Sequence, residues 1–337
     1  MTDHQVFNLP DLTLQSGVTC PDASLVYKTY GELAPDKSNV IVYPSAFGGR
    51  HMDMEWIVAE GRPMDPTKYF IVIMNMFGNG LSTSPSNATA PLDRAQAPQF
   101  TIYDNVMAQQ RLLREVFGIE RIALVFGRSM GAIQAFHWGA LFPEQVARIC
   151  CICGAARPSP HNQLFLQGLW ATLTADENWK AGWFEDQPQR GLLALARVYA
   201  GWAMSQAFYR EETWRDLDYA SMEEFVVARW EGFLQRHDAN DILAMFWSWQ
   251  HADISANEIY KGDFDGALGA IQAKALIMPS RSDLYFRVED NRREVARMPN
   301  AELRPIESIW GHMAGSWPEG AEDGRFIDEA VHELLAS

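Results

Sequence analysis

Residues 127–131 read Gly-Arg-Ser-Met-Gly, and this G-x-S-x-G pattern constrains the fold more than any other segment of the chain. The apolar residues 122–126 before it suit a buried strand, and residues 132–141 after it suit a packed helix. A serine at the tip of a sharp strand-to-helix turn is a nucleophile elbow, whose glycines let the turn close without clashes. The alternative is an ordinary loop with an idle serine, but the flanking strand and helix favour a nucleophile at Ser129.

The charge balance of the chain excludes two classes of partner. The 337 residues include 28 lysines and arginines against 43 aspartates and glutamates, which gives a net charge of −15. Nucleic acids and anionic membrane surfaces both require a basic face, so neither is an expected partner. Hydrophobic residues make up 47% of the chain, which predicts a globular protein with a sizeable core.

Three of the four cysteines, Cys150, Cys151 and Cys153, crowd into one apolar segment. Neighbours in an extended strand cannot easily pair, and no C-x-x-C spacing is present, so we expect buried free thiols and no metal. Free thiols suit a reducing compartment. The first residues show no signal peptide, and no apolar run is long enough to span a membrane. These features predict a cytoplasmic protein.

Apolar strands and helices alternate along the chain except in one long block. Continuous apolar strands between helices predict an α/β fold with a mostly parallel sheet flanked by helices. Residues 157–266 instead offer helical segments, no predicted strand, and eight of the twelve tryptophans. Packing within a thin helical layer is the expected role of these tryptophans, and lining a substrate pocket is the alternative. We therefore predict a core domain at 1–156 and 267–337 with a helical cap (lid) insertion at 157–266.

A serine nucleophile needs a base that takes its proton and an acid that holds the base. In a fold with a nucleophile elbow these partners lie later in the chain, the acid before the histidine, on loops after later strands. Asp283 and His312 each follow a predicted strand in this order. The rival acids, none of which directly ends an apolar strand, are Asp263, Asp265 and Asp290. The predicted nucleophile, base and acid are therefore Ser129, His312 and Asp283.

The oxygen that becomes negative when serine attacks an ester requires preorganised N–H donors. One donor is expected to be the backbone N–H of Met130, the residue after the nucleophile. The second is expected from the loop 44–49, which reads Pro-Ser-Ala-Phe-Gly-Gly, with Ala46 as first candidate and Phe47 as second. A simple glycine turn is the alternative for this loop, although adjacent glycines also suit a close approach of backbone to substrate.

With these motifs in place, the chain resembles the homoserine O-acetyltransferase family of α/β-hydrolases along most of its length. The similar segments are 27–33, 101–106, 127–131, 187–192, 237–240, 282–285 and 311–312. The resemblance implies the α/β-hydrolase fold, a homodimer, and the roles of nucleophile, acid and base for Ser129, Asp283 and His312. It also places Ala46 at the oxyanion position of the family.

Two departures from the family concern the substrate. Met313 follows His312 where the family has an aspartate suited to an amine, and residues 203–206 read Ala-Met-Ser-Gln where the family has a tyrosine and an arginine suited to a carboxylate. Loss of both charges weakens binding of a zwitterion such as homoserine. We therefore expect an apolar substrate pocket, with Met204, Met313, Phe47 and Arg128 as its candidate lining residues.

These observations predict a serine hydrolase that cleaves a small ester through an acyl-enzyme, without metal or organic cofactor. The first alternative is an O-acyltransferase with the same triad, for which acyl-CoA would be the co-substrate. A second is cleavage of an amide or a carbon–carbon bond by that triad. A third, from another class, is a non-catalytic scaffold of the α/β-hydrolase fold that binds a ligand.

Overall fold

A single twisted sheet organises the computed structural model, which describes residues 3–316 and 321–337. Within this part of the chain the sheet has eight strands. In spatial order they are β1 (Gln5–Thr13), β2 (Thr19–Tyr30), β4 (Phe70–Met74), β3 (Val40–Pro44), β5 (Leu124–Arg128), β6 (Arg148–Ile152), β9 (Lys274–Met278) and β10 (Ala301–Leu303). The pairs β1–β2 and β2–β4 are antiparallel and the others are parallel, which confirms the predicted fold class.

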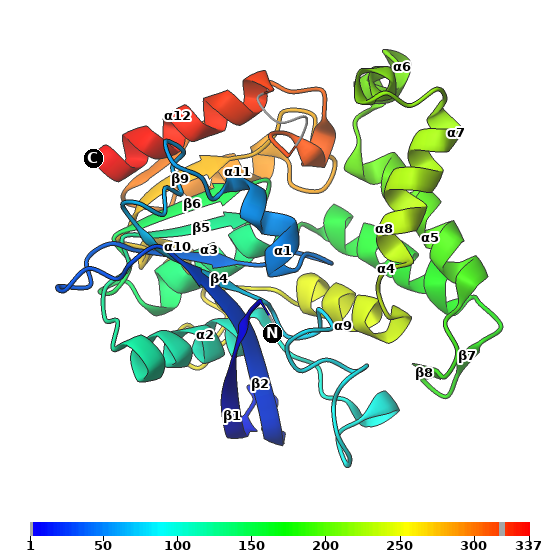
Figure 1. The fold of residues 1–337 in the computed structure, drawn as a ribbon, viewed down its shortest axis with the longest axis horizontal. Coiled ribbons are helices and arrows are strands. Elements are labelled where there is room, and N and C mark those ends of the chain that lie inside the picture. Colours follow the sequence, from blue (N-terminus) through cyan, green and yellow to red (C-terminus); the bar gives the residue numbers. More distant parts are fainter. Residues whose placement is uncertain (1–2, 317–320) are drawn as a thin grey trace.

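Helices cover both faces of the sheet because its central strands are apolar on both sides. In β3, Val40 and Val42 pack into the core on one face, and Ile41 and Tyr43 pack into the core on the other. Figure 1 shows α12 (Glu322–Ala336) on one side of the sheet and α2 (Ile102–Phe117) on the other. The remaining helices of the core are α1 (His51–Met54), α3 (Met130–Leu141), α10 (Phe264–Gly269) and α11 (Val288–Val295).

The predicted cap consists mainly of helices, which gather beside the carboxyl ends of the parallel strands at the right of Figure 1. They are α4 (Pro160–Thr174), α5 (Gln189–Ala203), α6 (Gln206–Arg210), α7 (Met222–Phe225), α8 (Gly232–Leu234) and α9 (Ala239–Gln250). A π-helical segment, Val226–Glu231, joins α7 to α8. The predicted boundary after residue 266 falls inside α10, so a division that keeps helices whole comes before Phe264.

The prediction that the cap contains no strand is wrong. Strands β7 (Trp179–Lys180) and β8 (Trp183–Phe184) pair as an antiparallel hairpin. Ala181 and Gly182 both have positive φ angles, 53° and 83°, as the central residues of a type I′ turn do. Strands of two residues are too short to give an alternating pattern in the sequence.

The cysteines agree with the expectation of buried free thiols. All four cysteines are buried and unpaired. Among the residues described, none of the helices combines the length and the apolar character needed to cross a membrane.

Candidate active site

Ser129 lies at the tight turn between β5 and α3, where its backbone adopts φ 54° and ψ −125°. Close packing around this turn requires both flanking glycines. A Cβ atom at Gly127 would clash with the carbonyl oxygen of Gly131, and one at Gly131 would lie 2.7 Å from the carbonyl oxygen of Pro44. The N–H of Ser129 donates to the carbonyl oxygen of Ile152 in the neighbouring strand (2.9 Å), which fixes the turn to the sheet.

The structure brings the three predicted residues together in one hydrogen-bonded row. Oγ of Ser129 lies 2.9 Å from Nε2 of His312, and Nδ1 of His312 donates to Oδ2 of Asp283 at 2.8 Å. His312 and Asp283 are buried, whereas Ser129 is half-buried. The second carboxylate oxygen of Asp283 accepts the N–H groups of Tyr285 (2.7 Å) and Phe286 (3.3 Å). These contacts orient the carboxylate toward the imidazole.

The short 3-10 helix that carries His312 is held from both sides. The N–H of Gly311 donates to Oγ of Ser282, one residue before Asp283 (3.1 Å). From the elbow side, Nη2 of Arg128 donates to the carbonyl oxygen of Ala314 (2.6 Å) and to Oγ of Ser316 (2.7 Å). Arg128 therefore joins the nucleophile turn to the segment that follows the histidine.

The loop after β3 packs against the elbow with its two ends fixed. Nε2 of Gln134 on α3 donates to the carbonyl oxygen of Ser45 (2.8 Å). The hydroxyl oxygen of Ser45 accepts the N–H of Met76 (2.9 Å). Within the described residues, the N–H groups of Ala46 and Met130 donate to no protein acceptor. Preorganised donors without an internal acceptor are what an oxyanion hole requires.

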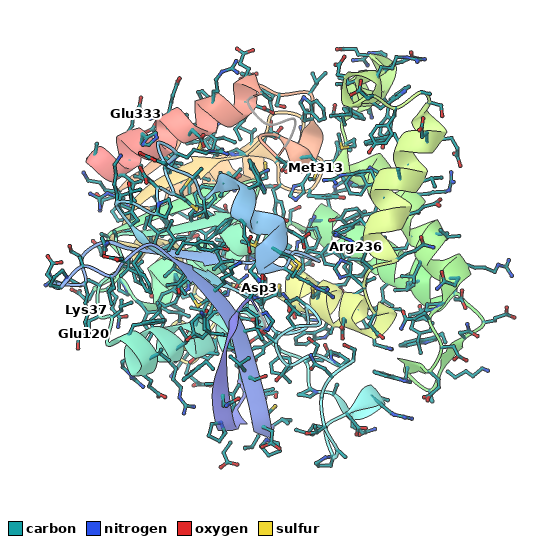
Figure 2. The ribbon with its side chains drawn as sticks, in the orientation of Figure 1. Asp3, Lys37, Glu120, Arg236, Met313 and Glu333 are labelled. Carbon is teal, nitrogen blue, oxygen red and sulfur yellow. The ribbon has the colours of Figure 1, made fainter. Side chains whose placement is uncertain are left out.

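A cavity of 690 Å³ opens beside Ser129, between the core and the cap. Of the predicted pocket residues, Phe47, Arg128 and Met313 line it, as do Ala46, Ser129 and His312. The other lining residues are Tyr43, Pro44, Gly49, Asp53, Met54, Trp56, Cys153, Tyr199, Ala228, Arg229, Trp230, Gly232, Phe233, Arg236 and Ser316. In Figure 2 the labelled side chains of Met313, from the core, and Arg236, from the cap, mark its two sides.

The prediction that Met204 lines the pocket needs correction. Met204 directly follows α5, is fully buried, and is absent from the cavity lining. Its backbone packs against Gly311, where a Cβ atom would lie 2.9 Å from the carbonyl carbon of Met204. Tyr199, more than one turn earlier on α5, lines the cavity instead.

The pocket also carries more charged residues than the sequence led us to expect. The charged residues of the lining are Arg128, Arg229, Arg236 and Asp53, three cations and one anion. Arg229 lies on the π-helical segment, whose widened turn is a feature that recurs at functional sites. No motif in the sequence marks Arg229 or Arg236, because both lie in a helical segment without a catalytic pattern.

Two clusters in the described part of the chain have ligand atoms close enough to share a metal ion. The first, Cys153 with Asp283 and His312, coincides with the hydrogen-bonded row. Burial, reinforced by the Asp283 carboxylate, raises the pKa of Cys153 to about 12, so its thiol stays protonated and is a poor ligand. The second cluster consists of Asp3, His4 and His51, none of which belongs to the lining of the cavity.

Known proteins that resemble this chain in sequence and fold include ester hydrolases. A family model described as the alpha/beta hydrolase fold matches residues 39–317. An ethyl acetate hydrolase of Pseudomonas veronii is 38% identical over 340 residues, which cover 99% of this chain and 95% of that protein. The solved structure of an acetylester hydrolase from Corynebacterium glutamicum is 36% identical, covers 99% of this chain and 96% of that one, and has a TM-score of 0.95.

Acyltransferases are also among the similar proteins. A homoserine O-acetyltransferase of Bradyrhizobium diazoefficiens is 31% identical over 338 residues, which cover 90% of this chain and 84% of that protein. The resemblance expected from the sequence is therefore confirmed, and it extends to ester hydrolases at higher identity.

Proposed function

We propose that this chain, which belongs to the α/β-hydrolase family, hydrolyses small acetate esters through an acyl-enzyme formed on Ser129. The observation that carries the proposal is the row in which Ser129, His312 and Asp283 hydrogen-bond at 2.9 and 2.8 Å beside a cavity. The similarity to an ethyl acetate hydrolase and an acetylester hydrolase supports small esters as the substrate class.

In the proposed reaction, Oγ of Ser129 attacks the ester carbonyl while Nε2 of His312 accepts the hydroxyl proton. His312 then gives this proton to the departing alcohol, which leaves the acyl group on Ser129. Water, deprotonated by His312, attacks the acyl-enzyme and releases the carboxylic acid. Asp283 holds the imidazole in the required tautomer and stabilises its charged form.

The tetrahedral oxyanion is proposed to accept the N–H groups of Ala46 and Met130. Their lack of a protein acceptor within the described residues supports this assignment. No step requires a metal or an organic cofactor.

The direct test is Ser129→Ala assayed on ethyl acetate and p-nitrophenyl acetate. Triad members act as a unit, so kcat is expected to fall by about 10⁶ with an unchanged melting curve. A fluorophosphonate is expected to label Ser129 in the wild type and not in the variant. Absence of both labelling and turnover in the wild type would instead favour the non-catalytic scaffold.

Acyl transfer from acyl-CoA to an alcohol is the second candidate, favoured by the identity to a homoserine O-acetyltransferase. By the family resemblance, Met313 stands where an aspartate is expected and residues 203–206 lack the expected arginine, which disfavours homoserine as the acceptor. Hydrolysis assayed with acetyl-CoA and homoserine present is expected to yield acetate and no O-acetylhomoserine. Formation of the acetylated product at a comparable rate would reverse this choice.

The homodimer implied by the family resemblance also belongs to the proposal. Light scattering coupled to size-exclusion chromatography is expected to give twice the chain mass of 38.1 kDa.

A further inference from the structure

The cavity beside Ser129 has a charge opposite to that of the whole chain. The chain carries 28 basic and 43 acidic residues, yet the charged lining of the cavity consists of three arginines and one aspartate. A cleft lined by one sign of charge concentrates ligands of the opposite sign. An anionic ligand approaching this acidic protein is therefore repelled by its overall charge and attracted by this cavity.

The charge of Arg128 is not neutralised by the groups it holds. Its Nη2 donates to the carbonyl oxygen of Ala314 and the hydroxyl of Ser316, and both acceptors are uncharged. Arg128 directly precedes Ser129, so this positive charge lies close to the reacting centre.

The other two arginines come from the cap and share one acidic neighbour. Nη1 of Arg236 lies 3.4 Å from Oδ1 of Asp53, and its guanidinium stacks over the Phe233 ring at 5.5 Å. Burial lowers the pKa of Arg229, and the positive charge of Arg236 lowers it further, while Asp53 opposes this. The residues that line the cap side of the cavity therefore include two guanidinium groups, with Asp53 as the carboxylate of the lining.

The size of the cavity assigns this positive side to the alcohol part of the substrate. An acetyl group is small, and a cavity of 690 Å³ is in the range that encloses a drug-sized ligand. Once the acetyl group is on Ser129, most of the cavity remains for the alcohol. The cap arginines lie in this remaining part, where Arg236 and Trp56 reach solvent.

We propose that the preferred substrate is an acetate ester whose alcohol part carries a carboxylate, which Arg229 and Arg236 bind. This inference rests on the proposed function. Arginine suits the role because its planar guanidinium donates two parallel hydrogen bonds to a carboxylate. Arg128 adds to the positive field near the ester without being the primary partner.

The test compares esters that differ only in charge. The substrates are ω-acetoxy carboxylates with two to four carbons in the acid, each paired with its neutral primary amide. For the best chain length, kcat/KM of the carboxylate is expected to exceed that of the amide about 10- to 100-fold at low salt, as expected for hydrogen bonds to a charged group. Because salt screens partly exposed charges, the ratio is expected to shrink in 0.5 M NaCl.

Variants assign the effect to the two cap arginines. Arg229→Met and Arg236→Met each reduce the carboxylate-to-amide ratio, the double variant brings it close to one, and the lysine variants restore part of it. Arg210→Met is the matched control, since Arg210 is an exposed cap arginine outside the cavity lining and its replacement leaves the ratio unchanged. Labelling of Ser129 by a fluorophosphonate in each variant shows that the nucleophile is still activated.

A binding measurement keeps this inference separate from the proposed function. In Ser129→Ala, the ω-hydroxy carboxylates are titrated while the fluorescence of the cavity tryptophans, Trp56 and Trp230, is followed. Saturable binding that the double arginine variant loses supports the anionic site even if no ester is hydrolysed. A ratio near one for every chain length, or saturable binding that survives in the double variant, overturns it.

Discussion

The two walls of the cavity are built in different ways. On the core wall, Ser129 is fixed by a turn with positive φ, and Asp283 is fixed by two backbone N–H donors. On the cap wall, Tyr199, Arg229 and Phe233 project from helical segments, and no turn of this kind fixes their backbone. The reacting groups thus depend on backbone geometry at strand ends, whereas the groups that select the substrate depend on how helices pack.

Buried carboxyl groups lie at two points where the core leads into the cap or contacts it, and we call these points the joints. Glu294 on α11 accepts the N–H of Ala156 (2.9 Å), just before the cap begins. Asp241 on α9 accepts the N–H (2.9 Å) and the hydroxyl (2.6 Å) of Ser86 in a core loop. Burial raises the pKa of both acids to about 7. Ionisation of these two acids is therefore expected to make the attachment of the cap to the core depend on pH.

The largest effect is expected at the core wall from Asp283→Asn. Loss of the carboxylate favours the wrong tautomer of His312, so kcat for ethyl acetate is expected to fall by about 10⁴. KM is expected to change little because Asp283 does not line the cavity. Steady-state kinetics measure both values. Full activity in this variant would assign the role to another acid, such as Asp290.

Gly131→Ala tests whether backbone packing, rather than a side chain, sets the oxyanion hole. The added methyl group would lie 2.7 Å from the carbonyl oxygen of Pro44 and displace the Ala46 loop. Activity is expected to fall by about 10²- to 10³-fold, the cost of losing one oxyanion donor. Overpacking is expected to lower the free energy of unfolding by about 1–3 kcal/mol, measured by urea denaturation.

The matched control for this variant lies on the cap wall. Gly201 on α5 has no heavy atom within 4 Å of an added Cβ, so Gly201→Ala is expected to raise stability by up to about 1 kcal/mol. Its ester hydrolysis is expected to match the wild type. Equal losses of activity and stability in Gly131→Ala and Gly201→Ala would mean that the core does not depend on close backbone packing more than the cap does.

The pH dependence of the free energy of unfolding tests whether the buried carboxyl groups at the joints contribute to stability. Glu294 has a folded pKa of about 7, above its value in the unfolded chain, so between about pH 4.5 and 7 the folded state binds the extra proton. The contribution of Glu294 to the free energy of unfolding is therefore fully present below this range and is expected to be lost, by about 3 kcal/mol, as pH rises through it. Denaturation of wild type and Glu294→Gln at pH 5, 6, 7 and 8 measures the difference.

In Glu294→Gln this fall is expected to be smaller, because the amide does not ionise and still accepts the N–H of Ala156 through its oxygen. Asp241→Asn is the companion variant at the other joint. Identical pH profiles in the wild type and both variants would show that these joints do not control stability.

The smallest effect is expected from Met204→Leu. Met204 is fully buried outside the cavity, so a swap of similar volume is expected to cost less than about 1.5 kcal/mol of stability and to leave KM within twofold. Met313→Leu is the comparison, because Met313 lines the cavity and its replacement changes KM more. A larger change in KM for Met204→Leu would return that residue to the substrate site.

The sequence predicted the elements of the core wall well, for local reasons. The central strands β3, β4, β5, β6 and β9 are short apolar runs, and that pattern is readable from neighbouring residues. Elements of the cap were less predictable, since the two-residue strands of its hairpin carry no periodic signal. Met204 was wrongly predicted to line the pocket because the sequence does not reveal which residues at the end of α5 face the core.

By itself, the sequence determined the elbow at Ser129, the order of acid and histidine along the chain, and the α/β alternation, because glycine turns and apolar periodicity act over a few residues. Only the tertiary structure decided that the three side chains meet at hydrogen-bonding distance and that Arg229 and Arg236 face the same cavity. Contacts between residues a hundred or more positions apart depend on the packing of whole elements. No local pattern records that packing.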